Sequence, residues 1–448
     1  FKTCFSACLA KQRKTEKEKH RRKPKATSSM YARKGTNKFT LFIAAAAWLL
    51  HGCGTSKTAT NSTSPAPVTT TQAQTKAAIK SPHIAYQEKQ AWAFNGGSVV
   101  FHNQFAGARL NGVTQENDST FRLEIKPENQ PINPSPWYAF KVWSKSQKPT
   151  YVKLTYGSNE HRYSPKTSTD MRAWQDVPQS HFIDKTGAFF KVPVSQDTLI
   201  VAGQEMMTAA MTYRWMDSLA QKPFLKRQTI GQSYLGQPIE AFSTSGSDGK
   251  KLMVVLSRQH PPEVTGFMAM QEFVRVVTGD SPLAKRFREK FEVLIMPMLN
   301  PDGVDLGHWR HSAGGVDLKR DWETFKQPET VAVRDFIAQK TGAQGAKVYF
   351  MLDFHSTHRD VFYTNTETTP THVPGFTNRW LKAVEAALPN YKANIRPSGN
   401  GGNVSKSWFY RTYNADAVTY EVGDDTPRNQ IKLKGRIAAE KMMELLVQ

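Results

Sequence analysis

The stretch KLMVVLSRQHPPEVTGFMAMQEFVRVV (residues 251–277) decides the fold class of this chain. Its apolar run, residues 252–256, has the length of a buried strand and is too short for a helix. Two prolines follow, and the residues after them place apolar side chains at helical spacing, which predicts a helix with the prolines at its entry and Glu263 in its first turn. A buried strand that runs into a helix is the repeating unit of an α/β fold.

The same alternation of strand and helix continues along the second half of the chain. We expect a helix around residues 204–220 and then alternating apolar strands and helices up to residue 446, which predicts an α/β region over residues 204–448. Before it, runs such as GSVVFHNQF, STFRLEIK and WYAFKVWS alternate apolar with polar residues between turn residues. These runs predict an antiparallel β-sandwich over residues 84–203, and their pattern offers no chemistry of its own.

Charge and cysteine content limit the classes of function. The 448 residues carry a formal net charge of +22, and residues 1–29 contain 10 basic against 2 acidic residues. With Arg33, Lys34 and Lys38, the N-terminal segment accounts for half of the excess, and the rest is spread thinly over residues 53–448. That distribution argues against nucleic acid and favours acidic ligands or surfaces. Since only Cys4 and Cys8 accompany Cys53, no intramolecular disulfide is possible beyond residue 53.

The sequence MYARKGTNKFTLFIAAAAWLLHGCG, residues 30–54, is typical of an export signal. It has a basic start and an apolar run too short to span a bilayer, which predicts a signal peptide over residues 30–52 preceded by 29 residues absent from the mature protein. Gly52 before Cys53 resembles the lipobox of bacterial lipoproteins, which implies an acylated Cys53 at the outer membrane, facing the periplasm. A cleaved secretory signal with an incidental cysteine is the alternative. Residues 53–83 contain too little apolar surface to fold and are expected to form a flexible tether.

Three predicted strands end at side chains that bind metals or transfer protons. KLMVVLSRQ runs into His260, KVYFMLDF into His355, and DAVTY into Glu421. Because the carboxyl ends of strands in an α/β sheet converge at one edge, these side chains are expected to meet. His260, His355 and Glu263 supply two imidazoles and one carboxylate, the set that a catalytic zinc uses while a fourth position stays open for water. Asp353 shares a strand face with His355, where we expect a buried structural hydrogen bond.

Several motifs in order carry a family resemblance. The succession of His260-x-x-Glu263, NPDGVDLGHWRHSAGGVDLKRDW, LDFH and TYEVGDD resembles the zinc metallocarboxypeptidases of the carboxypeptidase A type over residues 229–448. The preceding segment, with PWYAFKV, is similar to the β-domain of the cytosolic carboxypeptidases and their bacterial relatives. The resemblance implies a mixed central sheet with helices on both faces, one bound Zn²⁺, and hydrolysis of a C-terminal peptide or amide bond.

The resemblance also implies roles for the residues at the reacting centre. It makes His260, Glu263 and His355 the zinc ligands and Glu421 the general base. Asp317 matches an acid that orients the first zinc histidine, an arrangement that fixes the ring tautomer and raises the basicity of the ligand.

Substrate recognition is implied at four basic positions. Arg310 matches the arginine that polarises the scissile carbonyl, and Arg320 matches one that binds the terminal carboxylate of the substrate. Lys319 stands where the family usually has Asn, which replaces a directional amide by a point charge. In that family, the residue fifteen before the general base lies at the bottom of the pocket for the departing side chain, and the matching residue here is Lys406. The implied preference is for Glu, Asp, or a γ-linked or D-configured analogue.

Two other functions are compatible with the sequence. One is an amidase or deacylase of the same fold that acts on cell-wall stem peptides, with a muropeptide in place of a peptide substrate. The other is an envelope binding protein, anchored in the membrane through Cys53, with a vestigial metal site. The presence of all three ligands, the base and both arginines argues against the second alternative.

Overall fold

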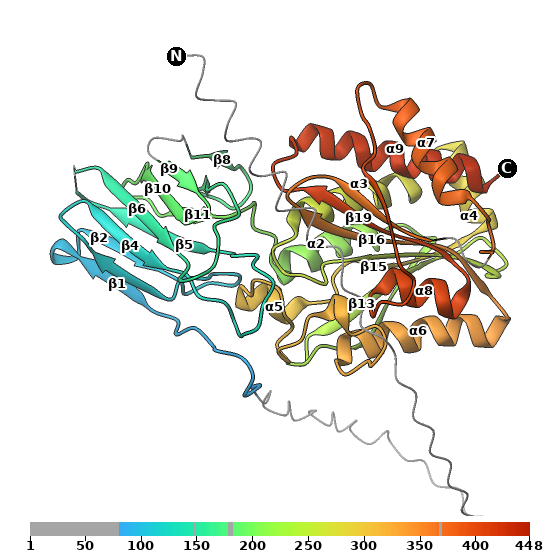
Figure 1. Cartoon of the computed structure of the whole chain (residues 1–448), viewed down its shortest axis with the longest axis horizontal. Coiled ribbons are helices and arrows are strands. Elements are labelled where there is room, and N and C mark those ends of the chain that lie inside the picture. Colours follow the sequence, from blue (N-terminus) through green and yellow to red (C-terminus); the bar gives the residue numbers. More distant parts are fainter. Residues whose placement is uncertain (1–79, 147, 178–181, 367–369) are drawn as a thin grey trace, which may run out of the picture. The chain divides into compact units, whose positions relative to one another are not determined.

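The computed structural model describes residues 80–146, 148–177, 182–366 and 370–448 (Figure 1). The expected signal peptide, Cys53 and most of the expected tether lie outside these residues, so the predictions made for them stay predictions. Among the helices in the described ranges, none combines the length and the apolar character that a membrane crossing requires.

The N-terminal β-rich region contains two sheets that share one core. One sheet has the strand order β1-β2-β5-β11-β7-β8 and the other has the order β3-β4-β6-β10-β9. The strands are β1 (Ala91–Phe94), β2 (Val99–His102), β3 (Gly112–Gln115), β4 (Thr120–Glu124), β5 (Ala139–Ser144), β6 (Thr150–Thr155), β7 (Lys166–Ser168), β8 (Gln175–Asp176), β9 (Phe182–Asp184), β10 (Gly187–Val192) and β11 (Leu199–Ala202). The antiparallel arrangement is confirmed with one exception, since β4 and β6 pair in parallel. The chain passes through β5 of the other sheet between these two strands, so both run in the same direction.

The α/β region is built on an eight-stranded mixed sheet of order β12-β13-β15-β14-β16-β19-β17-β18. The strands are β12 (Leu225–Gln232), β13 (Pro238–Thr244), β14 (Lys251–Ser257), β15 (Glu292–Met296), β16 (Lys347–Thr357), β17 (Val361–Asn365), β18 (Ile395–Ser398) and β19 (Asp416–Gly423). The four central strands β15, β14, β16 and β19 are parallel, and antiparallel pairs flank them. The mixed sheet implied by the resemblance is therefore confirmed.

Helices cover both faces of this sheet, as Figure 1 shows. Within β14, Met253 and Val255 pack into a cluster with α3, α4, α7 and α9, whereas Leu252 and Val254 pack into a second cluster with α6 and α8. This alternation follows from the two-residue period of a strand. The helices are α2 (Ala209–Leu219), α3 (Val264–Val277), α4 (Pro282–Lys290), α5 (Pro301–Leu306), α6 (Pro328–Gln344), α7 (Phe376–Ala387), α8 (Ser405–Tyr413) and α9 (Arg428–Leu446).

The junction between β14 and α3 differs in detail from the expected one. We expected the two prolines to enter the helix and Glu263 to lie in its first turn, but α3 begins at Val264 and Glu263 is its N-cap residue. The Glu263 side chain makes no capping hydrogen bond to the helix. Its carboxylate is instead held by two histidines described below.

The first turn of α6 contains a buried carboxyl group with an unusual pKa. Glu329 accepts a hydrogen bond from the Tyr234 amide at 3.0 Å, and its second oxygen has no partner among the described residues. Burial raises the pKa of Glu329 from 4.5 to about 7, and the nearby carboxylates of Asp302 and Asp321 add to the rise. The folded protein therefore favours the neutral form of this side chain.

We expect Glu329→Gln to stabilise the protein at pH 8 and to have little effect near pH 4. The folded state keeps a proton that the unfolded chain releases above pH 4.5, so stability falls as pH rises from about 4.5 to about 7. The pKa difference corresponds to at most about 3 kcal/mol. Thermal unfolding of the wild type and of Glu329→Gln across this pH range measures the difference in their stability, with the exposed Glu323→Gln as control. A stability difference between the two proteins that is independent of pH would contradict the prediction.

Candidate active site

Three neighbouring strands bring the candidate catalytic residues together. His260 follows β14, and His355 and Glu421 lie near the carboxyl ends of β16 and β19. These strands are adjacent in the sheet, and His355 and Glu421 are direct partners in the parallel register. The strand ends therefore meet as the sequence predicts.

His260, Glu263 and His355 form a buried cluster. One potential ligand atom from each lies within 4.8 Å of the others. Oε1 of Glu263 lies 2.7 Å from Nδ1 of His260, and Oε2 lies 2.6 Å from Nδ1 of His355. Burial opposes ionisation of Glu263, but the two histidines lower the pKa of its carboxyl well below the usual value. Both imidazoles thus turn the same type of nitrogen toward one carboxylate.

The outer nitrogens of both rings contact carboxylates. Nε2 of His260 lies 2.9 Å from Asp317, and Nε2 of His355 lies 3.1 Å from Asp353. Burial opposes protonation of His355, but Asp353 and Glu263 raise its pKa to about 9. We expected a structural hydrogen bond at Asp353, and its carboxylate accepts from Gln259 at 2.6 Å and from Ser405, in addition to its contact with the histidine two residues later on the same strand face. Both carboxylate–imidazole contacts fix the orientation of the rings.

This donor set fits a zinc ion. Two imidazole nitrogens and one carboxylate are the protein ligands of many catalytic zinc sites, and each histidine here has the carboxylate partner that such ligands usually have. The carboxylates of Asp353 and Glu263, which raise the pKa of His355, also favour a cation beside this ring. His260, Glu263 and His355 are therefore the residues that would hold the metal.

A cavity of about 380 Å³ lies beside this cluster. The predicted site residues that line it are His260, Glu263, Arg310, Lys319, Arg320, Lys406 and Glu421. Arg310 donates from Nε to Asp317 at 2.7 Å, so Asp317 bridges this arginine and His260. Burial opposes ionisation of Asp317, but His260 and Arg310 lower its pKa. Arg320 lines the cavity with an exposed side chain.

Lys319 contacts the candidate general base. Its ammonium lies 2.8 Å from Oε1 of Glu421, and both side chains are buried. Burial opposes the charged form of Lys319, but Glu421 and Asp353 raise its pKa. Lys319, which was expected to attract the substrate carboxylate, therefore pairs with Glu421 in the structure.

Lys406 is a buried cation without an acidic partner among the described residues. It lies in the first turn of α8, is 2% exposed, and donates to the Ser398 carbonyl at 3.3 Å. Burial lowers the pKa of Lys406 to about 8, and the positive charges of Lys319 and Arg411 contribute. A carboxylate that enters the cavity would relieve both effects.

The β-rich region also contributes to this cavity, which the sequence analysis did not anticipate. Asn133 and Arg162 line it. Arg162 donates to Asp424 at 2.9 Å and 3.2 Å, and to the carbonyl of Ser356, the residue after His355, at 3.0 Å. No motif marks Arg162, because its partners in the α/β region are 194 and 262 positions away in the sequence.

Comparison with known proteins was consistent with this geometry. A family model described as zinc carboxypeptidase matches residues 212–441. Cytosolic carboxypeptidase 3 of Mus musculus is 25% identical over 302 residues, which are 59% of this chain and 30% of that protein. Cytosolic carboxypeptidase 6 of Homo sapiens is 23% identical over 293 residues, 58% of this chain and 57% of that protein. The chain spans less than two thirds of the length of either relative.

Solved structures share the fold. A metallo-carboxypeptidase from Burkholderia cenocepacia superposes with a TM-score of 0.64 at 19% identity, over 78% of this chain and 98% of that one. A metallo-carboxypeptidase from Pseudomonas aeruginosa, in complex with (2-guanidinoethylmercapto)succinic acid, gives a TM-score of 0.64 at 20% identity, over 77% of this chain and 98% of that one. These likenesses confirm the fold class, a mixed α/β sheet preceded by a β-rich region.

Proposed function

The chain belongs to the zinc carboxypeptidase family, and we therefore propose that it is a zinc-dependent metallocarboxypeptidase. The observation that carries the proposal is the buried cluster of His260, Glu263 and His355, whose ligand atoms lie within 4.8 Å of one another. The cluster opens on a cavity that also contains Glu421 and Arg310. A metal site, a proton acceptor and a donor for an oxyanion are the parts that metal-assisted hydrolysis of an amide requires.

The proposed mechanism assigns one step to each side chain. Zinc, when bound, lowers the pKa of a water ligand to about 7 and polarises a carbonyl oxygen. Glu421 takes the proton of the attacking water and later donates it to the leaving amine. Arg310, held by Asp317, donates hydrogen bonds to the negative charge that develops on the carbonyl oxygen. Lys319 holds the Glu421 carboxylate in the cavity.

We propose that the departing residue is acidic. The support is Lys406, a nearly fully buried ammonium that lines the cavity and pairs with no carboxylate among the described residues. A buried charge without a partner is costly, so an acidic side chain gains a charge-assisted hydrogen bond there that a neutral one does not. Arg320 binds the terminal carboxylate in this proposal. Glu, Asp, or a γ-linked or D-configured analogue satisfies both contacts.

An amidase that acts on cell-wall stem peptides is the second candidate. It is favoured by the position of Lys319, whose ammonium contacts Glu421 and leaves Arg320 to recognise a terminal carboxylate. Because only Arg320, whose side chain is exposed, is left to bind the terminal carboxylate, the site discriminates less against substrates in which this carboxylate is blocked. The envelope location expected from the N-terminal sequence makes muropeptides a natural test substrate.

Purified protein and a panel of peptides test both candidates. We expect hydrolysis that a chelator abolishes and added zinc restores, because a zinc ion held by His260, Glu263 and His355 would activate the water that Glu421 deprotonates. Peptides ending in Glu should exceed those ending in Leu or Lys by about tenfold or more in kcat/KM, as expected for one buried charge contact. An amidated peptide and a muropeptide distinguish the candidates, since only an amidase cleaves the blocked terminus equally well. A zinc-loaded protein that hydrolyses none of these substrates would contradict both.

A further inference from the structure

The loop that carries Arg310 is anchored in the β-rich region. Trp309, the preceding residue, has a fully buried indole that belongs to the core cluster of the two N-terminal sheets. Its ring lies edge-on to that of Tyr156, with centroids 6.4 Å apart. The chain therefore inserts one side chain into the β-rich core immediately before the arginine that faces the cavity.

A single carboxylate of the β-rich region binds the backbone of this loop. Glu128, between β4 and β5, is fully buried. One of its oxygens accepts from the Trp309 amide at 2.8 Å, and the other accepts from the Arg310 and His311 amides at 2.9 Å and 2.7 Å. Burial opposes ionisation of Glu128, but His308, Arg109 and the amides lower its pKa. Three charge-assisted hydrogen bonds to consecutive amides fix the backbone at Arg310.

Neighbouring residues reinforce this contact. Arg109 lies 3.8 Å from the Glu128 carboxylate and donates from Nε to the Gly307 carbonyl at 2.8 Å. On the other side of Arg310, Asn129 contacts Nδ1 of His311 at 2.6 Å and donates to the Gly315 carbonyl at 3.0 Å. The β-rich region thus holds the loop on both sides of the arginine.

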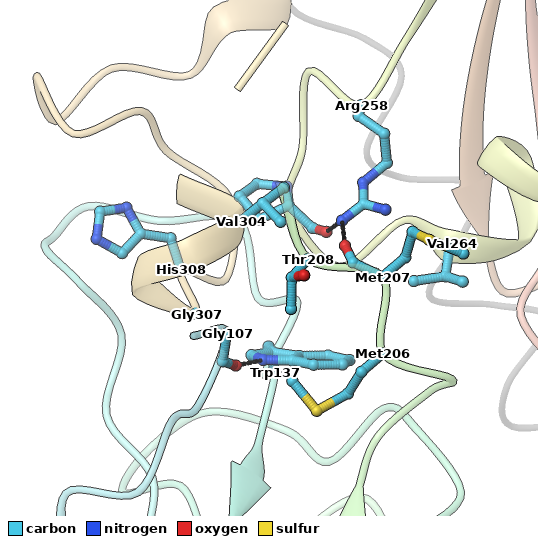
Figure 2. Close-up of a pocket in the computed structure, with 11 residues that line it drawn as sticks. Gly107, Trp137, Met206, Met207, Thr208, Arg258, Val264, Val304, Gly307 and His308 are labelled. Atoms are coloured by element: carbon cyan, nitrogen blue, oxygen red, sulfur yellow. Dashed lines mark hydrogen bonds between the residues drawn. The ribbon is translucent and has the colours of Figure 1, made fainter. Parts of the chain in front are cut away.

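The backbones of the two regions touch next to this loop. The Gly107 amide donates to the Asp305 carbonyl at 2.7 Å, and the Trp137 indole donates to the Gly107 carbonyl at 2.8 Å, the lower dashed line in Figure 2. Gly307 has a φ of +65°, and a Cβ there would lie 2.4 Å from the Ala108 carbonyl oxygen. Glycine at position 307 is therefore required both by the backbone conformation and by the close approach.

We propose that Glu128 is a positioning residue for Arg310, an inference that rests on the proposed function. Asp317 holds the guanidinium group of Arg310 and Glu128 holds its backbone, so the arginine is fixed from two parts of the chain. Glu128 does not line the cavity and acts only through the loop. Because a shift of about 1 Å at a catalytic group can cost about 100-fold in rate, the β-rich region contributes to catalysis in this way.

Glu128→Gln tests the proposal. The amide side chain has one acceptor oxygen in place of two, so at least one loop amide loses its partner. We expect kcat/KM to fall by about 10- to 100-fold at unchanged zinc content, less than the loss of Arg310 itself. Glu124→Gln is the matched control, since Glu124 ends β4, is half exposed, and pairs with the exposed Lys126. Its kcat/KM should stay within about twofold, as for most exposed ion pairs.

A buried Arg109 without its partner can destabilise the first variant, so a second variant removes both charges. Arg109→Met combined with Glu128→Gln leaves no unpaired buried ion at this point. The fall in kcat/KM should persist in this protein even where its thermal unfolding returns toward that of the wild type. Recovery of kcat/KM together with stability would show that Glu128 only supports the fold.

Ligand binding separates positioning from a general structural defect. A phosphonate peptide analogue ending in Glu carries the tetrahedral charge that Arg310 contacts, whereas free glutamate does not. Glu128→Gln should weaken the phosphonate by about 10- to 100-fold and leave glutamate within about threefold. In an Arg310→Ala background, Glu128→Gln should change kcat/KM by less than about twofold, because coupled residues are not additive.

Equal weakening of both ligands, or full additivity with Arg310→Ala, would overturn the proposal. An active wild type with an equally active Glu128→Gln variant would count against Glu128 alone. A wild type that hydrolyses no peptide would count against the proposed function, and this inference would fall with it.

Discussion

Glu421→Gln is expected to retain zinc and to lose nearly all turnover. A glutamine cannot take the proton of the attacking water or return it to the leaving amine, and general acid–base groups contribute about 10²- to 10⁴-fold in rate. The metal should stay bound because Glu421 is not part of the cluster formed by His260, Glu263 and His355. The measurements are kcat on a peptide ending in Glu and the zinc content of the same sample.

The variant also removes the partner of a buried ammonium, so stability must be measured beside activity. Lys319 pairs with Glu421 at 2.8 Å, and its charge is left alone when the carboxylate is replaced. Glu421→Asp keeps a carboxylate on a shorter side chain, and its kcat should lie between those of the wild type and the glutamine variant. A folded, zinc-loaded Glu421→Gln protein with more than about a tenth of wild-type kcat would reject the role of general base.

Lys406→Asp is expected to reverse the preference for the departing residue. The substitution replaces an attractive contact with an acidic side chain by a repulsive one and creates a partner for a basic side chain. Truncation of one member of a buried, hydrogen-bonded charge pair costs about 2–5 kcal/mol, so the ratio of kcat/KM for peptides ending in Glu and in Lys should change by about 100-fold or more. The test compares peptides ending in Glu, Leu and Lys.

Lys406→Met separates the loss of attraction from new repulsion. It should reduce the advantage of Glu over Leu without favouring Lys. In the wild type, this advantage should decrease as pH rises past about 8, because burial lowers the pKa of Lys406 to that value and the neutral amine no longer attracts a carboxylate. An unchanged order among the three peptides in Lys406→Asp would remove Lys406 from the specificity pocket.

The parts of the fold that follow local rules were predictable from the sequence. The run of residues 252–256 with its proline-led helix gave β14 and α3, since strand burial and helix periodicity are local patterns. The meeting of His260, Glu263 and His355 followed from the convergence of parallel strand ends. Element boundaries were less accurate, since α3 begins at Val264, and Glu263, expected in its first turn, is the N-cap residue and contacts His260 and His355.

The remaining contacts depend on packing between distant segments. Arg162 and Glu128 reach the α/β region through partners about 180 to 260 residues away, and no periodicity encodes such pairs. The parallel pairing of β4 with β6 likewise depends on which sheet β5 joins. Lys319 shows the same limit within the site, since its position in the motif was clear but its contact with Glu421 depends on how the turn at residues 318–320 packs against the end of β19.

The burial of Trp309 has a consequence for biosynthesis. The last strand of the N-terminal sheets, β11, ends at Ala202, so a ribosome has made all their strands about a hundred residues before it adds the indole that their core contains. Until then the core of the two sheets lacks this indole, which packs edge-on against Tyr156 in the complete chain. The core of the β-rich region is therefore complete only after Trp309 has been synthesised. The same insertion attaches the neighbouring Arg310 to the β-rich region.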